Sequence, residues 1–162
     1  MATRNYLYPI LYPDFKPPRG SKPEAQLCME IANFLREQSL CFNFLCVWLH
    51  IPNQWAGLYK GRFGAELAHM GRINGAPDYV FSGKYGCFFV EVKTPKGIQS
   101  ENQIIFEKWC VDSGIPYYIC RSLKDVEKVL EIERTREKFV EDAVANHYIY
   151  QQALKKLKEL AE

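Results

Sequence analysis

Two short apolar runs, at residues 79–81 and 87–92, constrain the fold of this chain more than any other feature. Between them lies a Gly-Lys-Tyr-Gly segment at residues 83–86. Apolar, β-prone runs joined by a short turn that contains glycine are typical of a β-hairpin. The sequence therefore predicts two antiparallel strands here, around which the rest of the chain must complete a sheet.

Charged side chains stand at the open end of this hairpin. Asp78 precedes the first strand, and Glu91 and Lys93 close the second. Because side chains alternate across a strand, Glu91 and Lys93 face one side, while Val90 and Val92 point into the core. The antiparallel partner brings Asp78 back beside that pair. We therefore expect two carboxylates and one ammonium group at one end of a small sheet.

This set of groups suits the hydrolysis of a phosphodiester. Carboxylate oxygens are hard ligands for Mg²⁺ or Mn²⁺, and the backbone carbonyl of Val92 is placed to join them. Lys93 can hold a phosphate or a deprotonated water and offset developing negative charge. A Glu-x-Lys pair on a solvated sheet face is the alternative, and such a surface pair contributes little. The spacing of thirteen residues from Asp78 to Glu91 across a hairpin favours the site.

These residues resemble a known nuclease signature. Pro77-Asp78 followed by Glu91-Val92-Lys93 is similar to the PD-(D/E)XK motif. With Gly75-x-Pro77-Asp78 and Ser100-x-x-Gln103, the pattern resembles the virus-type replication-repair nuclease (VRR-NUC) branch of that superfamily. The resemblance covers residues 21–131. It implies a restriction-endonuclease-like α/β fold with an αβββαβ core.

The resemblance also implies roles for two residues outside the hairpin. It places Glu24 at the metal or its water shell, and it points the amide of Gln103 at the scissile phosphate or the attacking water. Both residues have a simpler alternative, because each stands at the fourth position of a helix capping box that opens with Ser21 or Ser100. The predicted catalytic residues are Asp78, Glu91, Lys93, Gln103 and Glu24, and the predicted metal ligands are Asp78, Glu91, the Val92 carbonyl and Glu24.

The remaining periodicity completes an α/β sandwich. Capping boxes and apolar stripes predict helices that begin near residues 21, 100 and 122, and β-formers predict a central strand at 41–49 and a core strand at 115–120. A short helix is expected at 65–72. For the helix that runs from 100 to 113, the expected core side chains are Ile105, Phe106, Trp109 and Cys110. The order of elements fits a mixed central sheet of about four strands.

Basic residues gather around the predicted site. Residues 60–96 hold six bases against three acids, two of which are predicted metal ligands. With metal bound, this region suits the phosphate backbone of DNA. Each base could equally keep a loop soluble. His50 and Asn53 lie in a His-x-Pro-Asn run that resembles another feature of the family. The candidate DNA-binding residues are His50, Asn53, Lys60, Arg62, Arg72 and Lys96.

The composition is that of an ordinary globular protein. The 162 residues are 48% apolar and 25% charged, and the net charge of +2 is too small to indicate nucleic acid by itself. Six cysteines without a C-x-x-C pair are interpreted as free thiols in a reducing compartment. No signal peptide or transmembrane run is visible, so we expect a soluble, cytoplasmic protein. Neither a membrane partner nor a nucleotide cofactor is expected.

Two terminal segments flank the predicted core at 21–131. Residues 1–20 hold four prolines and are expected to form an extended arm. Residues 132–162 contain neither glycine nor proline and carry apolar residues at helical spacing, which predicts a long C-terminal helix. That helix either packs on a second copy of the chain, giving a homodimer, or packs back on its own domain.

The function expected from these observations is a Mg²⁺- or Mn²⁺-dependent DNA endonuclease. The resemblance implies a branched or junction substrate in replication, repair or recombination. Because no base-reading module is visible, we expect readout of backbone and shape with weak sequence preference. The alternatives are a site-specific homing or restriction endonuclease on the same fold, and a non-catalytic DNA-binding or assembly protein.

Overall fold

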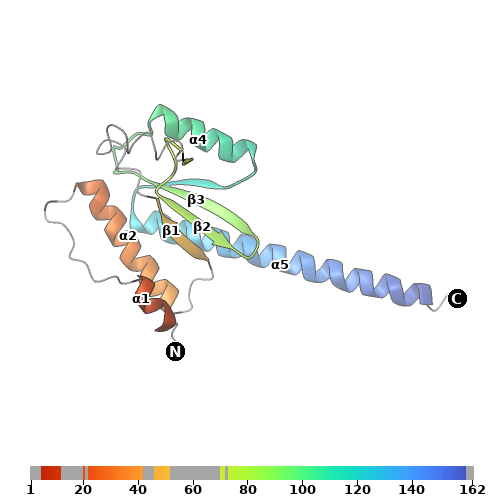
Figure 1. Cartoon of the computed structure of the whole chain (residues 1–162). Coiled ribbons are helices and arrows are strands. Elements are labelled where there is room, and N and C mark those ends of the chain that lie inside the picture. The colour runs from red at the N-terminus through yellow and green to blue at the C-terminus, as the bar shows by residue number, and fades with distance from the viewer. Residues whose placement is uncertain are drawn as a thin grey trace. The chain divides into compact units, whose positions relative to one another are not determined.

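The computed structural model describes residues 5–11, 20, 22–41, 46–51, 70–71 and 73–159. The chain divides into two compact units, Met1–Val126 and Glu127–Glu162. Figure 1 labels most of the elements, which are η1 (Asn5–Leu7), α1 (Tyr8–Leu11), α2 (Pro23–Leu40), β1 (Val47–His50), β2 (Tyr79–Gly83), β3 (Gly86–Val92), α4 (Glu101–Asp112), β4 (Tyr117–Cys120) and α5 (Leu123–Glu159).

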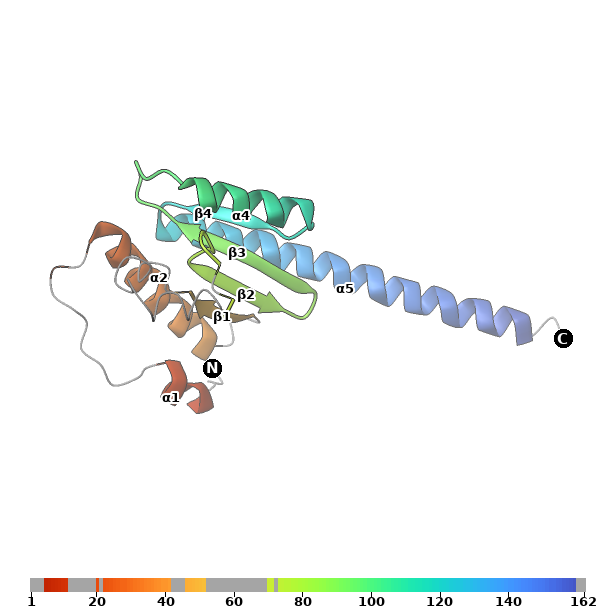
Figure 2. The same cartoon turned by 45° about the horizontal axis from the view of Figure 1, so that its top comes forward.

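A mixed sheet of four strands in the order β1-β2-β3-β4 forms the centre of the first unit (Figure 2). The predicted hairpin is confirmed, because β2 pairs with β3 antiparallel and opposes Tyr79 to Val90 and Phe81 to Phe88. β1 pairs antiparallel with β2, and β4 pairs parallel with β3. From α2 to α5 the elements follow the order αβββαβ and then a helix, so the expected fold class is confirmed.

Helix α2 lies on one face of this sheet. Its apolar stripe buries Cys28 and Leu35. The hydroxyl of Tyr79 donates a hydrogen bond of 2.8 Å to the carbonyl of Cys28. Further along the same face, the rings of Phe81 and Phe88 stack with centroids 4.6 Å apart. The Tyr79 hydroxyl therefore joins the hairpin to the helix, and the two phenylalanine rings pack against each other within the hairpin.

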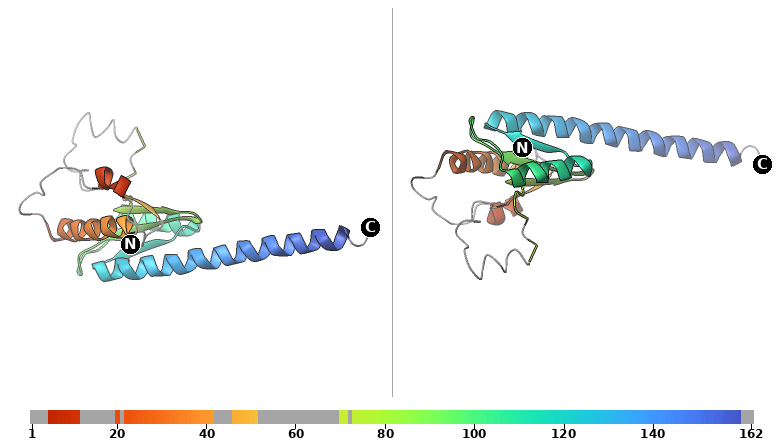
Figure 3. Two further views of the ribbon diagram at one scale, coloured as in Figure 1. Left: turned by 90° about the horizontal axis from the view of Figure 1, so that it is seen from below. Right: turned by 90° about the horizontal axis from the view of Figure 1, so that it is seen from above.

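Helix α4 lies on the opposite face. Phe89 precedes Val90 in β3 and therefore points away from α2, where its ring meets Phe106 of α4 edge-on at 5.6 Å. Seen from above, α4 lies over the strands (Figure 3). Cys110, one turn further along α4, is buried as well. Both faces of the hairpin are thus covered, which is why its open end is withdrawn from water.

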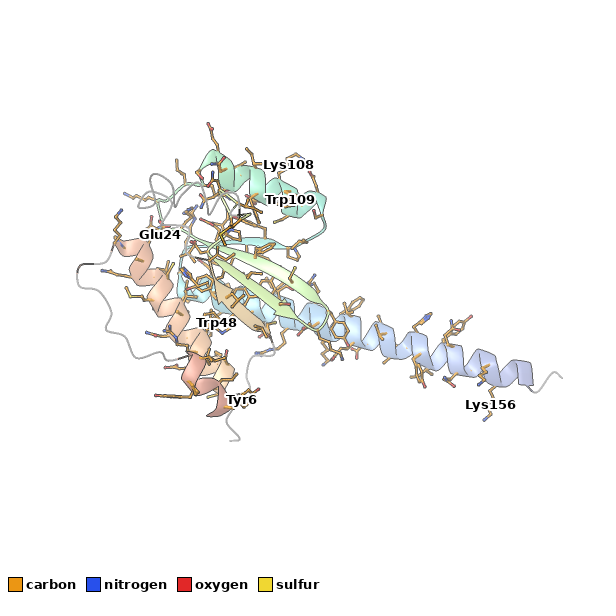
Figure 4. All side chains as sticks on the ribbon, viewed as in Figure 1. Tyr6, Glu24, Trp48, Lys108, Trp109 and Lys156 are labelled. Atoms are coloured by element: carbon orange, nitrogen blue, oxygen red, sulfur yellow. The ribbon has the colours of Figure 1, made fainter. Side chains whose placement is uncertain are left out.

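Two of the side chains predicted to lie in the core of α4 do not. Phe106 and Cys110 are buried, but Ile105 is 66% exposed and Trp109 is 57% exposed; the latter is labelled in Figure 4. The helix is apolar on more than one side, so the spacing of its apolar residues did not determine which stripe is buried.

The predicted central strand at 41–49 is wrong in extent and position. α2 continues to Leu40 with Cys41 as its C-cap, so β1 is restricted to Val47–His50. That short strand lies at the edge of the sheet. β propensity reports a fit to a partly buried pleated surface, which an edge strand also offers. Residues 42–45 and the predicted helix at 65–72, apart from 70–71, lie outside the described residues.

The N-terminal segment also differs from its prediction. Its described part, residues 5–11, forms the short helices η1 and α1 instead of an extended arm. A proline near a helix start is tolerated because the amide it lacks would be unpaired there. Lys22 is the N-cap of α2 and makes no side-chain cap, and the predicted cap Ser21 lies outside the described residues.

The second unit consists of the remainder of α5. This helix continues without interruption from Leu123 to Glu159, and the domain boundary expected at 131–132 falls inside it. All six cysteines lie outside disulfide bonds, and Cys28, Cys110 and Cys120 are buried. Across the residues that the structure describes, no helix is both long enough and apolar enough to cross a membrane.

Candidate active site

Asp78 is held in place by the main chain of the facing strand. Its own carbonyl accepts a hydrogen bond of 2.7 Å from the amide of Ile51, which extends the pairing between β1 and β2. Its carboxylate Oδ2 accepts a hydrogen bond of 2.8 Å from the amide of Val92. With 4% of its surface exposed, Asp78 sits across the open end of the hairpin from Glu91.

Glu91 is completely buried, and its two carboxylate oxygens have different surroundings. Oε1 lies 2.6 Å from Nζ of Lys93 and also accepts a hydrogen bond from Nε2 of Gln103. Oε2 is buried and has no hydrogen-bond partner among the residues that the structure describes. Burying a carboxylate oxygen without a partner is unfavourable in free energy. This oxygen is therefore suited to accept a cation or a further hydrogen-bond donor.

Gln103 forms the predicted capping box and also contacts Glu91, while its expected role toward the phosphate or the attacking water stays a prediction. The Ser100 hydroxyl accepts a hydrogen bond from the Gln103 amide, and the Gln103 side-chain Oε1 accepts one of 2.8 Å from the Ser100 amide, as a capping box requires. Because the cap fixes Oε1, the NH₂ group of the same side chain is directed at Glu91. The capping box and the contact with the site are therefore one arrangement.

Burial is the main cause that raises the pKa of both carboxyls, and neighbouring acids add to it. Desolvation raises the pKa of Asp78 to about 6, against the opposing effects of the Val92 amide and Lys93. Desolvation and then the charge of Asp78 raise the pKa of Glu91 to about 7, although Lys93 acts to lower it. Glu24 raises both. Perturbed carboxyls of this kind are typical of functional sites.

Glu24 lies in the first turn of α2, at the end of the helix nearest the open end of the hairpin (Figure 4). Its charge acts on Asp78 and Glu91, but within the described ranges no group of three or more His, Cys, Asp or Glu side chains is close enough to hold a metal ion. Mg²⁺ is commonly held by one or two carboxylates together with water and substrate oxygens. The pair of carboxylates and the unpaired Oε2 of Glu91 fit such an ion.

The predicted DNA-binding residues are only partly described. Lys96 is exposed on the turn that follows Lys93, and His50 ends β1 with its ring 5.0 Å from that of Tyr79. Asn53, Lys60, Arg62 and Arg72 lie outside the described residues.

Arg121, which the sequence did not single out, fixes the turn beyond Lys93. Its Nη1 donates hydrogen bonds of 2.7 Å to the carbonyls of Thr94 and Gly97. Its main-chain amide is bound to Asp125 at the start of α5. The signal available in the sequence was a basic residue directly after the last core strand, which is too common to be diagnostic.

Gly75 is the second residue whose contact could not be anticipated. It adopts a φ of +83°, and a Cβ placed there would lie 2.4 Å from the carbonyl carbon and oxygen of Asn102. The loop that leads to Asp78 is therefore pressed against the first turn of α4.

A solved structure shares this fold. A protein described as "VRR_NUC domain protein" superimposes with a TM-score of 0.52 and 17% sequence identity, over 68% of this chain and 87% of that one. No family model and no curated protein matches the sequence. At this identity the similarity is one of architecture. The chain therefore has the fold that its hairpin motif led us to expect, that of a VRR_NUC domain protein.

Proposed function

We propose that this chain is a metal-dependent nuclease that hydrolyses phosphodiester bonds in DNA. One observation supports this most strongly: two buried carboxylates and a lysine converge at the open end of the hairpin. One carboxylate oxygen there has no partner within the described part of the chain. Pure DNA binding has no use for buried carboxylates facing a phosphate. The shared fold with a VRR_NUC domain protein points the same way.

Asp78, Glu91 and the Val92 carbonyl would hold Mg²⁺ or Mn²⁺, and Glu24 would act through the water shell. When bound, the metal lowers the pKa of a water ligand and polarises the phosphate. The protein residues supply the remaining functions. Lys93 offsets negative charge that develops on the phosphate, and Gln103 fixes the orientation of Glu91.

DNA is the proposed polymer, and recognition is proposed to rest on backbone and shape. The exposed Lys96 on the turn held by Arg121 is a suitable phosphate contact. A branched or junction substrate in replication, repair or recombination is preferred. A site-specific endonuclease on the same fold is the alternative, and cleavage of one linear duplex at one sequence would favour it.

Helix α5 supports a homodimer as the working unit. Ile132, Phe139, Ala143, Tyr150 and Leu157 recur at spacings of seven and four along it. The large apolar side chains of Ile132, Phe139 and Tyr150 are each more than half exposed. This repeat is typical of helices that pair along their length. Acids outnumber bases over residues 127–142, whereas lysines predominate at 155–158, so an antiparallel pair would match opposite charges.

A cleavage panel tests the proposed function. Purified protein with Mg²⁺, Mn²⁺ or EDTA is incubated with linear, flapped, single-stranded and four-way DNA. We expect metal-dependent cleavage that is lost in Asp78→Ala and Glu91→Ala and retained in Asp112→Ala, which alters an exposed acid in α4. Full metal-dependent activity in Asp78→Ala would contradict the proposal. DNA binding without cleavage under every condition would favour the non-catalytic alternative.

A further inference from the structure

Gly75 makes a close approach that no other residue type can make. A Cβ at this position would lie 2.4 Å from the carbonyl carbon and oxygen of Asn102 and 2.7 Å from the amide nitrogen of Gln103. These are main-chain atoms of the first turn of α4, so no side-chain rotation can relieve the overlap. The same glycine has a φ of +83°, which other residues rarely adopt.

The two sides of this contact carry different halves of the candidate active site. Three residues beyond Gly75, Asp78 binds the Val92 amide. On the other side, Gln103 is fixed by its capping box and donates to Glu91. The contact between Gly75 and Asn102 therefore ties the loop that leads to Asp78 to the helix turn that orients Glu91.

Simple geometry gives the size of the disturbance that a side chain would cause. Ordinary van der Waals contacts of a Cβ begin about 1 Å beyond the 2.4 Å found here, so the loop and the helix would have to separate by about that amount. Active sites need their groups held to within about 0.5 Å, and a misplacement of about 1 Å can cost roughly 10²-fold in rate.

We propose that Gly75 is a positioning residue, which sets the separation between Asp78 and the pair formed by Glu91 and Gln103. The inference rests on the nuclease function proposed above. It adds that a backbone contact outside the hairpin holds the loop before Asp78 against the helix turn that orients Glu91. The hydrogen bonds to Ile51 and Val92 fix Asp78 on the sheet, and the Gly75 contact fixes the distance from that end of the sheet to the first turn of α4.

Gly114 provides a matched control. It also has a positive φ, +69°, but a Cβ there meets no atom of the described residues within 4 Å. Asparagine tolerates positive φ better than alanine does, so Gly75→Asn and Gly114→Asn isolate the overlap from the backbone strain. We expect Gly75→Asn to lower kcat about 10²-fold and to weaken Mn²⁺ binding with little change in KM for DNA. For Gly114→Asn, kcat, Mn²⁺ affinity and KM should each stay within about threefold of the wild-type value.

A double-mutant cycle separates positioning from general destabilisation. If Gly75 acts through the placement of Gln103 and Glu91, the two substitutions should not be independent. The fold-loss in kcat of the double variant Gly75→Ala, Gln103→Ala should then be much smaller than the product of the two single fold-losses. Multiplicative losses, or a kcat and Mn²⁺ affinity for Gly75→Asn within about threefold of the wild type, would overturn the inference.

A second pair of variants applies if Gly75 substitutions do not fold. Ser100→Ala loosens the first turn of α4, which Gly75 touches, whereas Ser122→Ala removes a similar cap at α5. Ser100→Ala should lower kcat whereas Ser122→Ala should not, and in a Gln103→Ala background Ser100→Ala should lower kcat little further. Equal effects of the two caps would contradict the inference.

The failure of the proposed function gives a different result from the failure of this inference. If the wild type neither cleaves DNA nor binds Mn²⁺, the nuclease function is wrong. The contact can still be tested by NMR. The Val92 amide donates its hydrogen bond to Asp78, so Gly75→Ala should shift the resonance of that amide. An unshifted Val92 amide would show that Gly75 does not position Asp78.

Discussion

The main-chain amide of Val92 donates a hydrogen bond of 2.8 Å to the carboxylate of Asp78. The bond joins the residue that precedes the first hairpin strand to the last residue of the second, and it brings Asp78 beside the strand position next to Glu91. The same amide lowers the pKa of Asp78, whereas desolvation raises it more strongly. The hydrogen bond from Val92 and the burial of the charge therefore have opposite effects on the pKa of this carboxyl.

Asp78→Asn should lose activity without losing stability. The amide side chain can still accept the hydrogen bond from Val92, and it removes a charge whose burial is unfavourable. We expect cleavage to fall by about 10³-fold or more, with an unchanged or higher melting temperature in the absence of metal. Asp78→Ala leaves the buried Val92 amide unpaired and should cost about 1–3 kcal/mol. Parallel thermal melts and cleavage assays check both, and equal stability of the two variants would contradict the role of the hydrogen bond.

The metal-free protein should become less stable as the pH rises from about 4 to about 7. The pKa values of Asp78 and Glu91 are raised on folding, from 3.8 to about 6 and from 4.5 to about 7. In this window the folded state therefore binds more protons than the unfolded state, so stability falls with pH and levels off above pH 7. The measurement is urea unfolding in EDTA across the pH range. The decrease of the unfolding free energy with pH should be smaller in Glu91→Gln and unchanged in Asp112→Asn. A wild-type stability that rises over this window would contradict the raised pKa values of Asp78 and Glu91.

Lys93 and Lys96 should differ in which kinetic constant they affect. Lys93 pairs with the buried Glu91, whereas Lys96 is exposed on the following turn. Lys93→Ala should lower kcat by about 10²–10³-fold, as expected for a group that stabilises transition-state charge. Mn²⁺ binding should persist but require a higher pH, because the lysine lowers the pKa of Glu91.

Lys96→Ala is the matched control for that variant. It should raise KM modestly and flatten the salt dependence of DNA binding by about one unit, with kcat little changed. Steady-state kinetics at two salt concentrations distinguishes the two lysines. A kcat loss of the same size in both variants would contradict a specific role of Lys93 in the transition state.

The sequence was a good guide where the structure depends on neighbours in the chain. The hairpin, the capping box at Ser100 and the convergence of Asp78 with Glu91 all follow from local spacing, and the structure confirms them. It was a poor guide where the outcome depends on distant partners. The side of α4 that is buried is set by the strands beneath it, so Trp109 was wrongly expected in the core.

The same limit applies to the supporting contacts of the site. The approach of Gly75 to Asn102 and the bonds from Arg121 to Thr94 and Gly97 join residues that are 24 or more positions apart in the chain. A glycine in a loop and an arginine after a strand each have many common explanations. Only the three-dimensional arrangement shows which residue each one meets.

Helix α5 should associate with a second copy in an antiparallel manner. We expect light scattering to give the mass of a dimer, and Phe139→Lys together with Tyr150→Lys to give a monomer, because both large side chains lie on the exposed stripe. Gln152→Lys, which alters an exposed residue on the opposite side of the same helix, is the control and should stay dimeric. In an antiparallel pair the acidic segment of one copy faces the lysines of the other, so high salt should weaken the dimer. A wild-type monomer, unchanged by removal of residues 136–162, would instead indicate that the helix packs on its own chain.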